Sequence, residues 1–417
     1  MKRKYSILPA AVLLLQMLTA CGTDAPAAPA AGQSEPVYAA EIEPRAADEA
    51  FCKQQTDFAL ELFRRVYETR TGENTMISPY SVMQAMTMTA NGAAGDTRQE
   101  MQQVLGGDIP LEMLNQYLYA WRTEQPHTDR CKLETANAIW YNENVPAPQS
   151  DFLRINREWF GADCFQAPFT QKTLSEINDW VKKHTDRMIP KILDRLLPNE
   201  TMVLVNAVCF DAKWQKKYEK EDIKEKNFMN ADGSTTGVQM MYSDENAYLS
   251  LDGAEGFLRY CDGPYAFAGI LPPEDMTADA YLAELDGQSL YSLLNDVQET
   301  SVRAGIPPFR FDTGTELQGI LPDMGMPLAF SDDADFSGVT GEQRGTGISR
   351  VIHKSYVEVD ANGTKAAAAT AVTLKENGII LDLETKFVIL DRPFIFMIVD
   401  MNTHLPVFIG TVQNLSE

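Results

Sequence analysis

The stretch GTKAAAATAVTLKENG, residues 363–378, decides how this sequence is interpreted. Its alanines, lysines and leucine favour a helix, so a surface helix from Lys365 to Glu376 is one interpretation. Asn377-Gly378 is a strong turn signal and favours a β-hairpin between VTLKE and IILDL. The third interpretation is a strand that can join a sheet, because the residues alternate with period two from Thr364.

In the strand interpretation, all the charge lies on one face. The uncharged face comprises Thr364, Ala366, Ala368, Thr370, Val372 and Leu374, and the other face comprises Lys365, Ala367, Ala369, Ala371, Thr373 and Lys375. This alternation first fails at Glu376. About a dozen residues could therefore lie in a sheet with the uncharged face buried. Their small side chains suit a segment that slips between strands already packed.

The composition is that of a folded, acidic protein. Of 417 residues, 44% are hydrophobic and 9% aromatic, which suffices for one large domain or two of medium size. The 59 acidic and 36 basic residues give a formal net charge of -23. This charge repels nucleic acid phosphates and anionic lipid, so we expect neither as an electrostatic partner.

The N-terminus is typical of a targeting segment. Lys2-Arg3-Lys4 is a basic flank, and the apolar run from Ile7 to Leu18 is short for a transmembrane helix. Leu18-Thr19-Ala20-Cys21 then resembles a bacterial lipobox, in which cleavage before Cys21 leaves that cysteine to be lipidated. Ordinary secretion with an incidental cysteine is the alternative.

Residues 22–50 are rich in alanine and proline and poor in large apolar side chains, which predicts a disordered tether. The predicted organisation is a signal peptide over 1–20, a lipidated Cys21 with its tether over 21–50, and one folded domain over 51–417. We expect the mature chain to be exported across the cytoplasmic membrane. It would then be lipid-anchored at the cell surface or extracellular, with the lipid as its only membrane contact.

The remaining cysteines do not form a recognisable framework. They are odd in number and show no C-x-x-C spacing, which favours buried thiols over a disulfide framework or zinc site, although one disulfide stays compatible with the sequence. The five are Cys52, Cys131, Cys164, Cys209 and Cys261.

Motifs for common chemistry are absent from the sequence. It has four histidines and no H-E-x-x-H, G-x-S-x-G or G-x-x-x-x-G-K-[ST] motif, the signatures of zinc hydrolases, serine hydrolases and P-loop proteins. The acidic run Ser331–Asp335 lacks the glycine and closing glutamate of an EF-hand, so a solvated turn is favoured over a calcium site. We expect no cofactor and no metal. An enzyme with an unrecognised catalytic site is one hypothesis for the function.

Helices are predicted early in the chain and strands late. Periodicity and capping signals, including Ser78-Pro79 and an N-terminal Asp96, predict helices over 52–67, 79–92, 96–106, 174–183 and 278–285. Apolar runs predict strands over 136–140, 202–210, 237–242, 265–271, 302–311, 351–359, 394–399 and 407–412. Because strands and helices do not alternate regularly, we predict an α+β fold with sizeable mixed or antiparallel sheets.

The passage HKSYVEVDANGTKAAAATAV, residues 353–372, resembles the hinge region of the serpins. The resemblance covers roughly residues 52–417, and six further motifs follow the family order. They are NTMISPYS (74–81), TANGAAGDTRQEM (89–101), LVNAVCFDAKW (204–214), FMNADGSTTGVQMMY (228–242), GMPLAFSDDADFSGVTG (325–341) and DRPFIFMIVDMNTHLPVFIGTV (391–412).

The resemblance implies a serpin fold, with helices packed on large β-sheets and an exposed reactive loop near the C-terminus. It implies a suicide inhibitor of serine endopeptidases, with cysteine endopeptidases as a second target class. The protease cleaves the loop, which inserts into the main sheet while the protease is still attached as an acyl-enzyme. The partner is then the target endopeptidase in a covalent complex, the chain is not an enzyme, and we expect a monomer. A non-inhibitory serpin that acts as a binding protein is the alternative.

The resemblance also assigns residues to the loop. The hinge comprises Gly363, Thr364, Ala366, Ala367, Ala368, Ala369 and Thr370. Counting from the hinge glycine as the family does places the cut between Asn377 and Gly378. The segment before Pro393 is longer than in many relatives, so the alternatives are Leu374, Lys375, Glu376 and Ile379. Lys375 would suit trypsin-like enzymes, and Leu374 would suit elastase-like or chymotrypsin-like ones.

Other matched positions lie beneath and at the top of the sheet that the loop enters. The cluster that must rearrange when the strands separate, called the shutter in this family, is matched by Ser78, Ser81, Asn206 and His353. Trp214 matches the tryptophan at the point where insertion begins, called the breach. Ordinary core packing is the alternative for the histidine and the tryptophan.

The chain departs from the family pattern at the top of the sheet. Ala361 stands where a glutamate is common, and Pro308 stands where its basic partner is frequent. Because both members of that ion pair are missing, the top of the sheet must be held by other contacts. Insertion is then expected to be easier to trigger.

Overall fold

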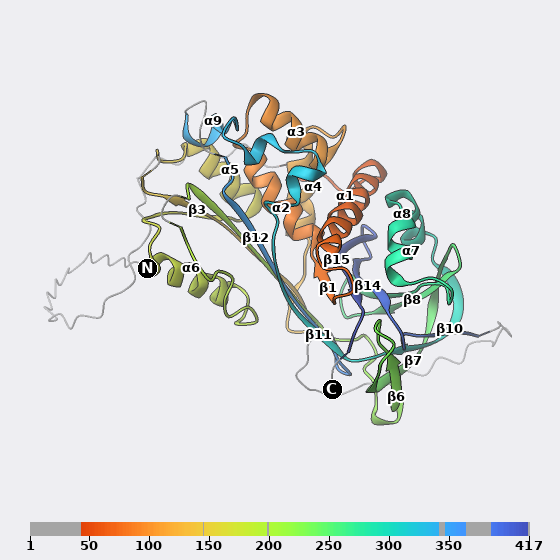
Figure 1. The fold of residues 1–417 in the computed structure, drawn as a ribbon. Helices are drawn as coiled ribbons and strands as arrows, with labels where there is room; N and C mark the ends of the chain where they lie inside the picture. The colour runs from red at the N-terminus through yellow and green to blue at the C-terminus, as the bar shows by residue number, and fades with distance from the viewer. Residues whose placement is uncertain (1–42, 145, 198–199, 342–346, 364–384, 416–417) are drawn as a thin grey trace, which may run out of the picture. The chain divides into compact units, whose positions relative to one another are not determined.

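The computed structural model describes residues 43–144, 146–197, 200–341, 347–363 and 385–415. Two β-sheets and the surrounding helices make up this folded unit, as the α+β prediction requires (Figure 1). The helices are α1 (Glu49–Glu68), α2 (Pro79–Ala90), α3 (Gly95–Gly106), α4 (Leu111–Thr123), α5 (Ser150–Phe160), α6 (Gln171–His184), α7 (Ala278–Glu284), α8 (Gly287–Asn295) and α9 (Ser337–Thr340).

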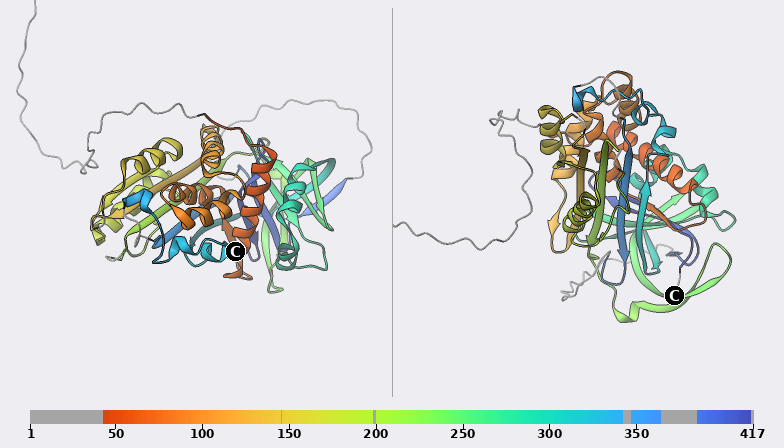
Figure 2. Two further views of the ribbon diagram at one scale, coloured as in Figure 1. Left: turned by 90° about the horizontal axis from the view of Figure 1, so that it is seen from above. Right: turned by 60° about the vertical axis from the view of Figure 1, so that its left-hand side comes forward.

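The six-stranded sheet contains one arrangement that matters for function. Along most of it the neighbours are antiparallel, but β12 pairs with β5 in parallel, and so does the short β4 with β3. Figure 2 (right) shows β12 in blue beside β5 in green. In spatial order the strands are β11 (Phe309–Glu316), β12 (Arg350–Val359), β5 (Met202–Ala212), β3 (Cys131–Asn142) and β2 (His127–Thr128), with β4 (Asp163–Ala167) beside β3.

The nine-stranded sheet supplies much of the core. Its strands β14 and β15 are apolar runs with every residue buried. In spatial order the strands are β1 (Thr75–Ile77), β15 (Leu405–Val412), β14 (Phe394–Asp400), β9 (Tyr265–Leu271), β8 (Ala254–Tyr260), β7 (Thr235–Leu251), β10 (Gln298–Ile306) and β13 (Lys386–Ile389), with β6 (Ile223–Met229) beside β7.

Strand β5 is covered on both faces, as its continuous apolar run predicts. Leu204, Val208 and Phe210 belong to the large core that includes α2. The alternate residues, among them Val203 and Val205, pack in a second cluster with α6. Figure 1 shows α6 and α2 on opposite sides of this sheet.

Two predicted boundaries are wrong. The single strand predicted over 302–311 is two strands in different sheets, because Pro307-Pro308 supplies no backbone N–H and interrupts the ladder. At the N-terminus, Asp48 caps α1 by accepting a hydrogen bond from the Phe51 N–H. Asp48 falls in the segment predicted as tether, so the folded part begins before residue 51.

The helix caps were predicted with mixed success. Ser78 is the N-cap of α2 and accepts a hydrogen bond from the Ser81 N–H, and Pro79 opens the helix, as predicted. Asp96 was predicted to begin α3 but lies within its first turn; the N-cap is Ala94, which makes no side-chain capping bond. The carboxylate of Asp96 there still lies near the positive end of the helix dipole.

The cysteines and the acidic run are structurally unremarkable. The five cysteines are present as thiols, four buried and Cys164 partly exposed. In the acidic run, the Asp333 N–H donates to the Ser331 hydroxyl, which closes a turn. Within the described ranges, no group of three or more His, Cys, Asp or Glu side chains is placed to hold a metal ion. Nor does any helix in those ranges have the length and apolar character to cross a bilayer.

Candidate functional site at a parallel seam

The β12–β5 pair, which we call the seam, is a parallel pair between two antiparallel pairs, β11–β12 and β5–β3, of the six-stranded sheet. The parallel register runs from Arg350 opposite Val203 to Tyr356 opposite Cys209. On its outer sides, β12 pairs with β11 and β5 pairs with β3, both antiparallel. A strand placed within the seam and antiparallel to both of its edges would therefore give a uniformly antiparallel run of β11, β12, the new strand, β5 and β3.

The chain turns back on itself directly after β12. The Asp360 N–H donates to the Gly363 carbonyl over 2.9 Å. The Asp360 carboxylate accepts from the backbone N–H of Asn362 at 2.7 Å and of Gly363 at 3.2 Å, which is an Asx-type turn. Gly363 consequently runs antiparallel to β12 and also forms an antiparallel bridge with Lys213, just after β5.

Gly363 lies so close to the end of β5 that a side chain would not fit. A Cβ atom there would be 2.3 Å from the Ala212 carbonyl oxygen and 2.7 Å from the Lys213 Cα. Both are backbone atoms, which cannot move aside as a flexible side chain could. The remaining hinge residues, Thr364 and Ala366 to Thr370, and all candidates for the reactive bond from Leu374 to Ile379 lie outside the described residues.

Trp214 and Tyr218 hold this turn in place. The Trp214 backbone N–H donates to the Asn362 carbonyl at 3.2 Å, and its indole Nε1 donates to the Asp360 carbonyl at 2.8 Å. The Tyr218 N–H donates to the Ala361 carbonyl at 3.2 Å. These contacts hold the top of the sheet, where the sequence lacks the expected ion pair. Pro308, which stands in place of the basic partner of that pair, is exposed.

A buried arginine lies behind Trp214 and Tyr218. The Arg259 guanidinium stacks 3.9 Å from the Tyr218 ring centroid and 5.0 Å from that of Trp214, which is cation–π geometry. Arg259 is ion-paired with Glu245 and donates to the Lys216 carbonyl. Arg259 was not predicted from the sequence, although an arginine within the apolar run GFLRYC was a signal for a buried, paired charge.

The residues predicted for the shutter meet in the middle of the seam. The backbone N–H of Ser78 donates to His353 Nε2 at 3.2 Å, and His353 Nδ1 lies 2.5 Å from Asn206 Oδ1. Because a backbone N–H can only donate, Nε2 is the acceptor and Nδ1 carries the proton. The imidazole is therefore neutral, and its burial lowers the pKa of His353 to about 3.

The Asn206 amide extends this cluster on the core side of the sheet. Its Nδ2 atom donates to the Ser81 carbonyl at 3.0 Å, the Ser81 hydroxyl at 2.5 Å and Asn137 Oδ1 at 2.7 Å. Asn137 in turn donates to Gln84 at 3.2 Å. All four predicted residues are thus brought together. Asn137 and Gln84 were missed, although an asparagine in the buried strand TANAIW could have been noticed.

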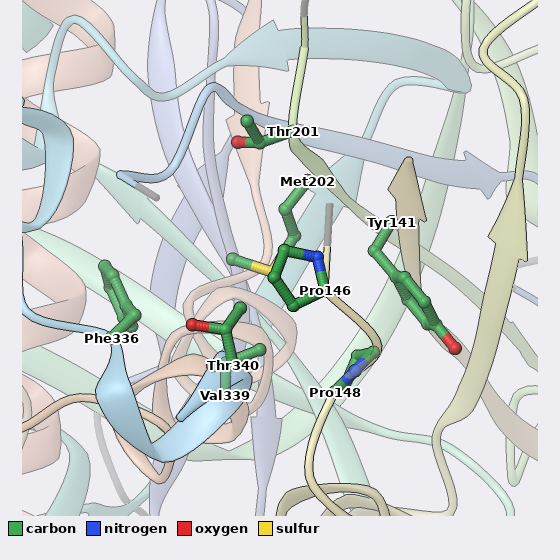
Figure 3. Close-up of a pocket in the computed structure, with 8 residues that line it drawn as sticks. All are labelled: Tyr141, Pro146, Pro148, Thr201, Met202, Phe336, Val339 and Thr340. Atoms are coloured by element: carbon green, nitrogen blue, oxygen red, sulfur yellow. The ribbon is translucent and has the colours of Figure 1, made fainter. Parts of the chain in front are cut away.

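At the other end of β5 the structure has a small apolar pocket (Figure 3). It offers no pair of acidic or basic groups for proton transfer. It lies where a strand running from Gly363 along the whole of β5 would end, since Met202 is the first residue of β5. Its lining residues are Tyr141, Pro146, Pro148, Thr201, Met202, Phe336, Val339 and Thr340.

Comparisons with known proteins agree on one family. The sequence profile described as "Serpin (serine protease inhibitor)" matches residues 53–415. An uncharacterized serpin-like protein from Thermococcus kodakarensis is 29% identical over 362 residues, covering 86% of this chain and 84% of that protein.

Two solved structures show the same architecture. The thermophilic serpin tengpin in its native state is similar with a TM-score of 0.82 and 40% identity, covering 90% of this chain and 98% of that one. Thyroxine-binding globulin in complex with thyroxine is similar with a TM-score of 0.77 and 25% identity, covering 88% of this chain and 99% of that one.

Proposed function

Because this chain belongs to the serpin family, we propose that it is a suicide inhibitor of serine endopeptidases, with cysteine endopeptidases as a second target class. Serpins are generally protease inhibitors and not catalysts. In this proposal the cleaved loop inserts into the seam while the protease is still attached as an acyl-enzyme. The single observation that carries it is the position of Gly363, already reversed beside β12 and bridged to Lys213.

The register at Gly363 supports insertion along the whole of β5. Gly363 bridges Lys213 in antiparallel fashion, so each step forward along the loop is matched by one step back along β5. Continued without a bulge, this register sets Thr364 opposite Ala212 and Leu374 opposite Met202. The inserted strand would match the bounds of β5, Met202–Ala212.

The two edges of the seam agree on this register. Gly363 also bridges Asp360 on the β12 side, and continuing that pairing sets Thr370 opposite His353. The β5 register sets the same Thr370 opposite Asn206, which already faces His353 across the seam. Insertion would therefore separate His353 from Asn206 and break the hydrogen bond between them, as the proposed role of a shutter requires.

The charge pattern of the loop also fits. Antiparallel neighbours point to the same face of a sheet, so the uncharged face of the loop would join Leu204, Val208 and Phe210 towards the large core. Lys365 and Lys375 would lie on the α6 side, at the two ends of β5, opposite Asp211 and Thr201. No charge would enter the buried middle of the seam.

The free energy gained on loop insertion is large enough to drive the proposed mechanism. Insertion replaces one parallel ladder with two antiparallel ladders, a gain of roughly ten backbone hydrogen bonds at about 1 kcal/mol net each. That gain is comparable to the net stability of a whole domain, about 5–15 kcal/mol. A gain of this size is enough to deform a tethered protease. Because loss of one oxyanion-hole donor slows acyl transfer by about 10² to 10³, a deformed protease would hydrolyse the acyl-enzyme slowly and stay trapped.

Sequence features alone support three further proposals. The reactive bond is Asn377–Gly378, with Leu374, Lys375, Glu376 and Ile379 as alternatives. Lipidation at Cys21 anchors the mature chain, through its tether, at the surface of a bacterial cell. The chain acts as a monomer.

The insertion mechanism can be tested at Ala368. The register sets this residue opposite Val208 and Ser355, both fully buried. We expect the native chain and Ala368→Ser to form SDS-resistant complexes with a member of a broad protease panel, and Ala368→Arg to be cleaved without trapping. N-terminal sequencing of the released fragment identifies the reactive bond. Equal complex yields from the serine and arginine variants would contradict the proposal.

A disulfide across the seam gives an independent test. Ser355 lies opposite Val208 in the parallel register, and adjacent strands are about 4.8 Å apart, within the Cα separations that a disulfide accepts. The double variant Val208→Cys with Ser355→Cys should, when oxidised, be cleaved without trapping the protease. Reduction of the same sample should restore trapping. The two single variants, treated with the same oxidant, are the controls.

A non-inhibitory binding protein is the second candidate function, favoured by the similarity to thyroxine-binding globulin in its ligand complex. The two candidates differ in what cleavage does to stability. Insertion should raise the thermal and guanidinium transitions sharply, whereas a passive loop should leave them unchanged. Melts of intact and loop-nicked chain therefore separate them.

A further inference from the structure

Strand β13 carries the most exposed large apolar side chain in the part of the chain that the structure describes. Phe387 is 69% exposed, compared with 49% for Met229 and 40% for Leu197. Strand β13 pairs with β10 and is the last strand of the nine-stranded sheet. Edge strands normally avoid exposed apolar side chains, because such side chains promote association. The position of Phe387 therefore indicates a surface that binds a partner.

Phe387 is not an isolated apolar side chain on this face. Paired residues of adjacent strands point to the same face of a sheet. Phe387 pairs with Arg303, and Ile389 pairs with Gly305, which in turn pairs with Tyr242 on β7. Ile389 leans over Gly305, where a Cβ atom would be 2.9 Å from its Cγ2. Ile389 and Tyr242 are half-buried, and together with Phe387 they form what we call the edge patch.

Two cations flank the edge patch. The Arg303 guanidinium lies 5.5 Å and the Lys224 ammonium 6.0 Å from the centroid of the Tyr242 ring, which is cation–π geometry. Arg303 is ion-paired with Asp244 at 2.8 Å. Lys224 is exposed, and its ammonium group forms no ion pair with any residue in the described ranges. This combination suits a protein partner that presents an apolar side chain beside a carboxylate.

The place of β13 in the chain identifies the partner. Eight residues lead from Gly378 to Lys386, the first residue of β13, and span at most about 28 Å. The fourteen residues from Gly363 to Asn377 on the other side of the proposed reactive bond span at most about 49 Å. A folded domain of about 200 residues has a radius of gyration of about 17 Å and is about 40 Å across. A protease bound at the reactive bond is therefore wider than its tether to β13 is long.

We propose that the edge patch is a docking surface for the target endopeptidase in the complex that precedes cleavage. An apolar side chain of the protease covers Phe387, and a carboxylate beside it pairs with Lys224. The inference rests on the proposed inhibitory function and adds to it a surface that selects the protease. Insertion along β5 would carry the protease towards the pocket that α9 lines, and Figure 1 shows α9 and β6 at opposite ends of this folded unit. The patch consequently acts on the first encounter and not on the trapped complex.

Rates of inhibition test the patch, with the panel protease that cleaves the loop fastest. Phe387→Ala should lower the second-order rate constant of inhibition about tenfold, because aromatic anchors carry much of the binding energy of an interface. Lys224→Ala should lower it and weaken its dependence on salt. Neither variant should change the thermal transition or the number of chains consumed per trapped protease. The matched control is Leu197→Ala, which also removes an exposed apolar side chain but lies beside Glu200, near the far end of β5.

An inactivated form of the same protease, which lacks its nucleophile, separates docking from trapping. We expect it to bind the native chain about tenfold more tightly than Phe387→Ala. If the active protease is trapped but both proteins bind the inactivated form equally and are inhibitors of equal rate, the patch fails and the inhibitor proposal stands. If the tenfold difference is found but no protease is ever trapped, the inhibitor proposal fails and the patch stands. Equal rates together with dimers of the native chain that Phe387→Ala abolishes would assign the patch to a second copy and overturn the proposal.

Discussion

Replacing His353 with glutamine should remove a specific source of acid sensitivity from the folded chain. The imidazole is neutral in the fold because it is buried and accepts a hydrogen bond from the Ser78 N–H. Burial lowers its pKa from 6.5 to about 3. The unfolded chain therefore binds a proton at His353 below pH 6.5 that the folded chain binds only near pH 3.

The sign and size of the effect follow from this difference. A depressed histidine pKa has no cost above pH 6.5, and it lowers the free energy of unfolding progressively as the pH falls towards 3. Each pH unit costs about 1.4 kcal/mol, which makes about 2.7 kcal/mol between pH 6.5 and 4.5. Glutamine does not titrate, but at pH 8 it should cost about 1–3 kcal/mol through lost hydrogen bonds. The variant should therefore have the lower free energy of unfolding at pH 8, and its difference from the native chain should shrink as the pH falls.

Guanidinium unfolding followed by tryptophan fluorescence at half-unit steps from pH 8 to 4.5 measures this difference. Comparing the two proteins at each pH cancels the titration of the many shared carboxylates. His127→Gln is the control for the loss of a histidine from the surface, because that side chain is 62% exposed. A difference between the native chain and His353→Gln that stays constant across this range would refute the neutral, buried assignment of His353.

Three further changes probe the seam. Gly363→Ala should lower the guanidinium midpoint of the intact chain, because the new methyl group meets the Ala212 carbonyl and displaces hydrogen bonds worth about 1 kcal/mol each; an unchanged midpoint would show that the turn is not held there. Trp214→Phe loses the 2.8 Å hydrogen bond to the Asp360 carbonyl and should lower the free energy of unfolding of the intact chain by about 1 kcal/mol. The same variant with a nicked loop is the reference for this measurement. Ser78→Ala loses the α2 cap and should cost about 0.5–2 kcal/mol in thermal melts, and a neutral result would contradict the capping role.

The elements that the sequence predicted well are those with local causes. Helix α2 begins where Ser78 and Pro79 place it, because the cap and the first-turn proline act within a few residues. Strand β5 is buried on both faces, as an uninterrupted apolar run requires. The strand predicted over 302–311 was wrong for a reason visible in the sequence, since Pro307-Pro308 interrupts any ladder.

The site was only partly accessible to sequence reasoning. The resemblance to serpins named Ser78, Asn206 and His353, but no local pattern joins positions so distant in the chain. They meet because the parallel register of β12 and β5 sets His353 beside Asn206, with α2 packed on the same face. Arg259 could not be assigned in this way, because its partner Glu245 lies on the neighbouring strand β7, and the pairing of the two residues depends on how β7 and β8 are placed in the nine-stranded sheet. By contrast, the residues DANG, 360–363, are a local signal for the turn at Asp360, although no turn was predicted there.

In the proposed mechanism, the anchoring of the loop at both ends explains why insertion follows cleavage. At one end the loop leaves the turn at Gly363, and at the other it enters β13 (Lys386–Ile389), which pairs with β10 in the nine-stranded sheet. If the uncut loop inserted as far as Leu374, about ten residues would have to lead the chain back from the far end of β5 to β13. Otherwise β13 would have to separate from β10. The contacts that hold the turn are few and worth about 1 kcal/mol each, far less than the gain on insertion. The uninserted state is therefore held by connectivity and by the closed seam, and a single cut between the two anchors removes the first of these restraints.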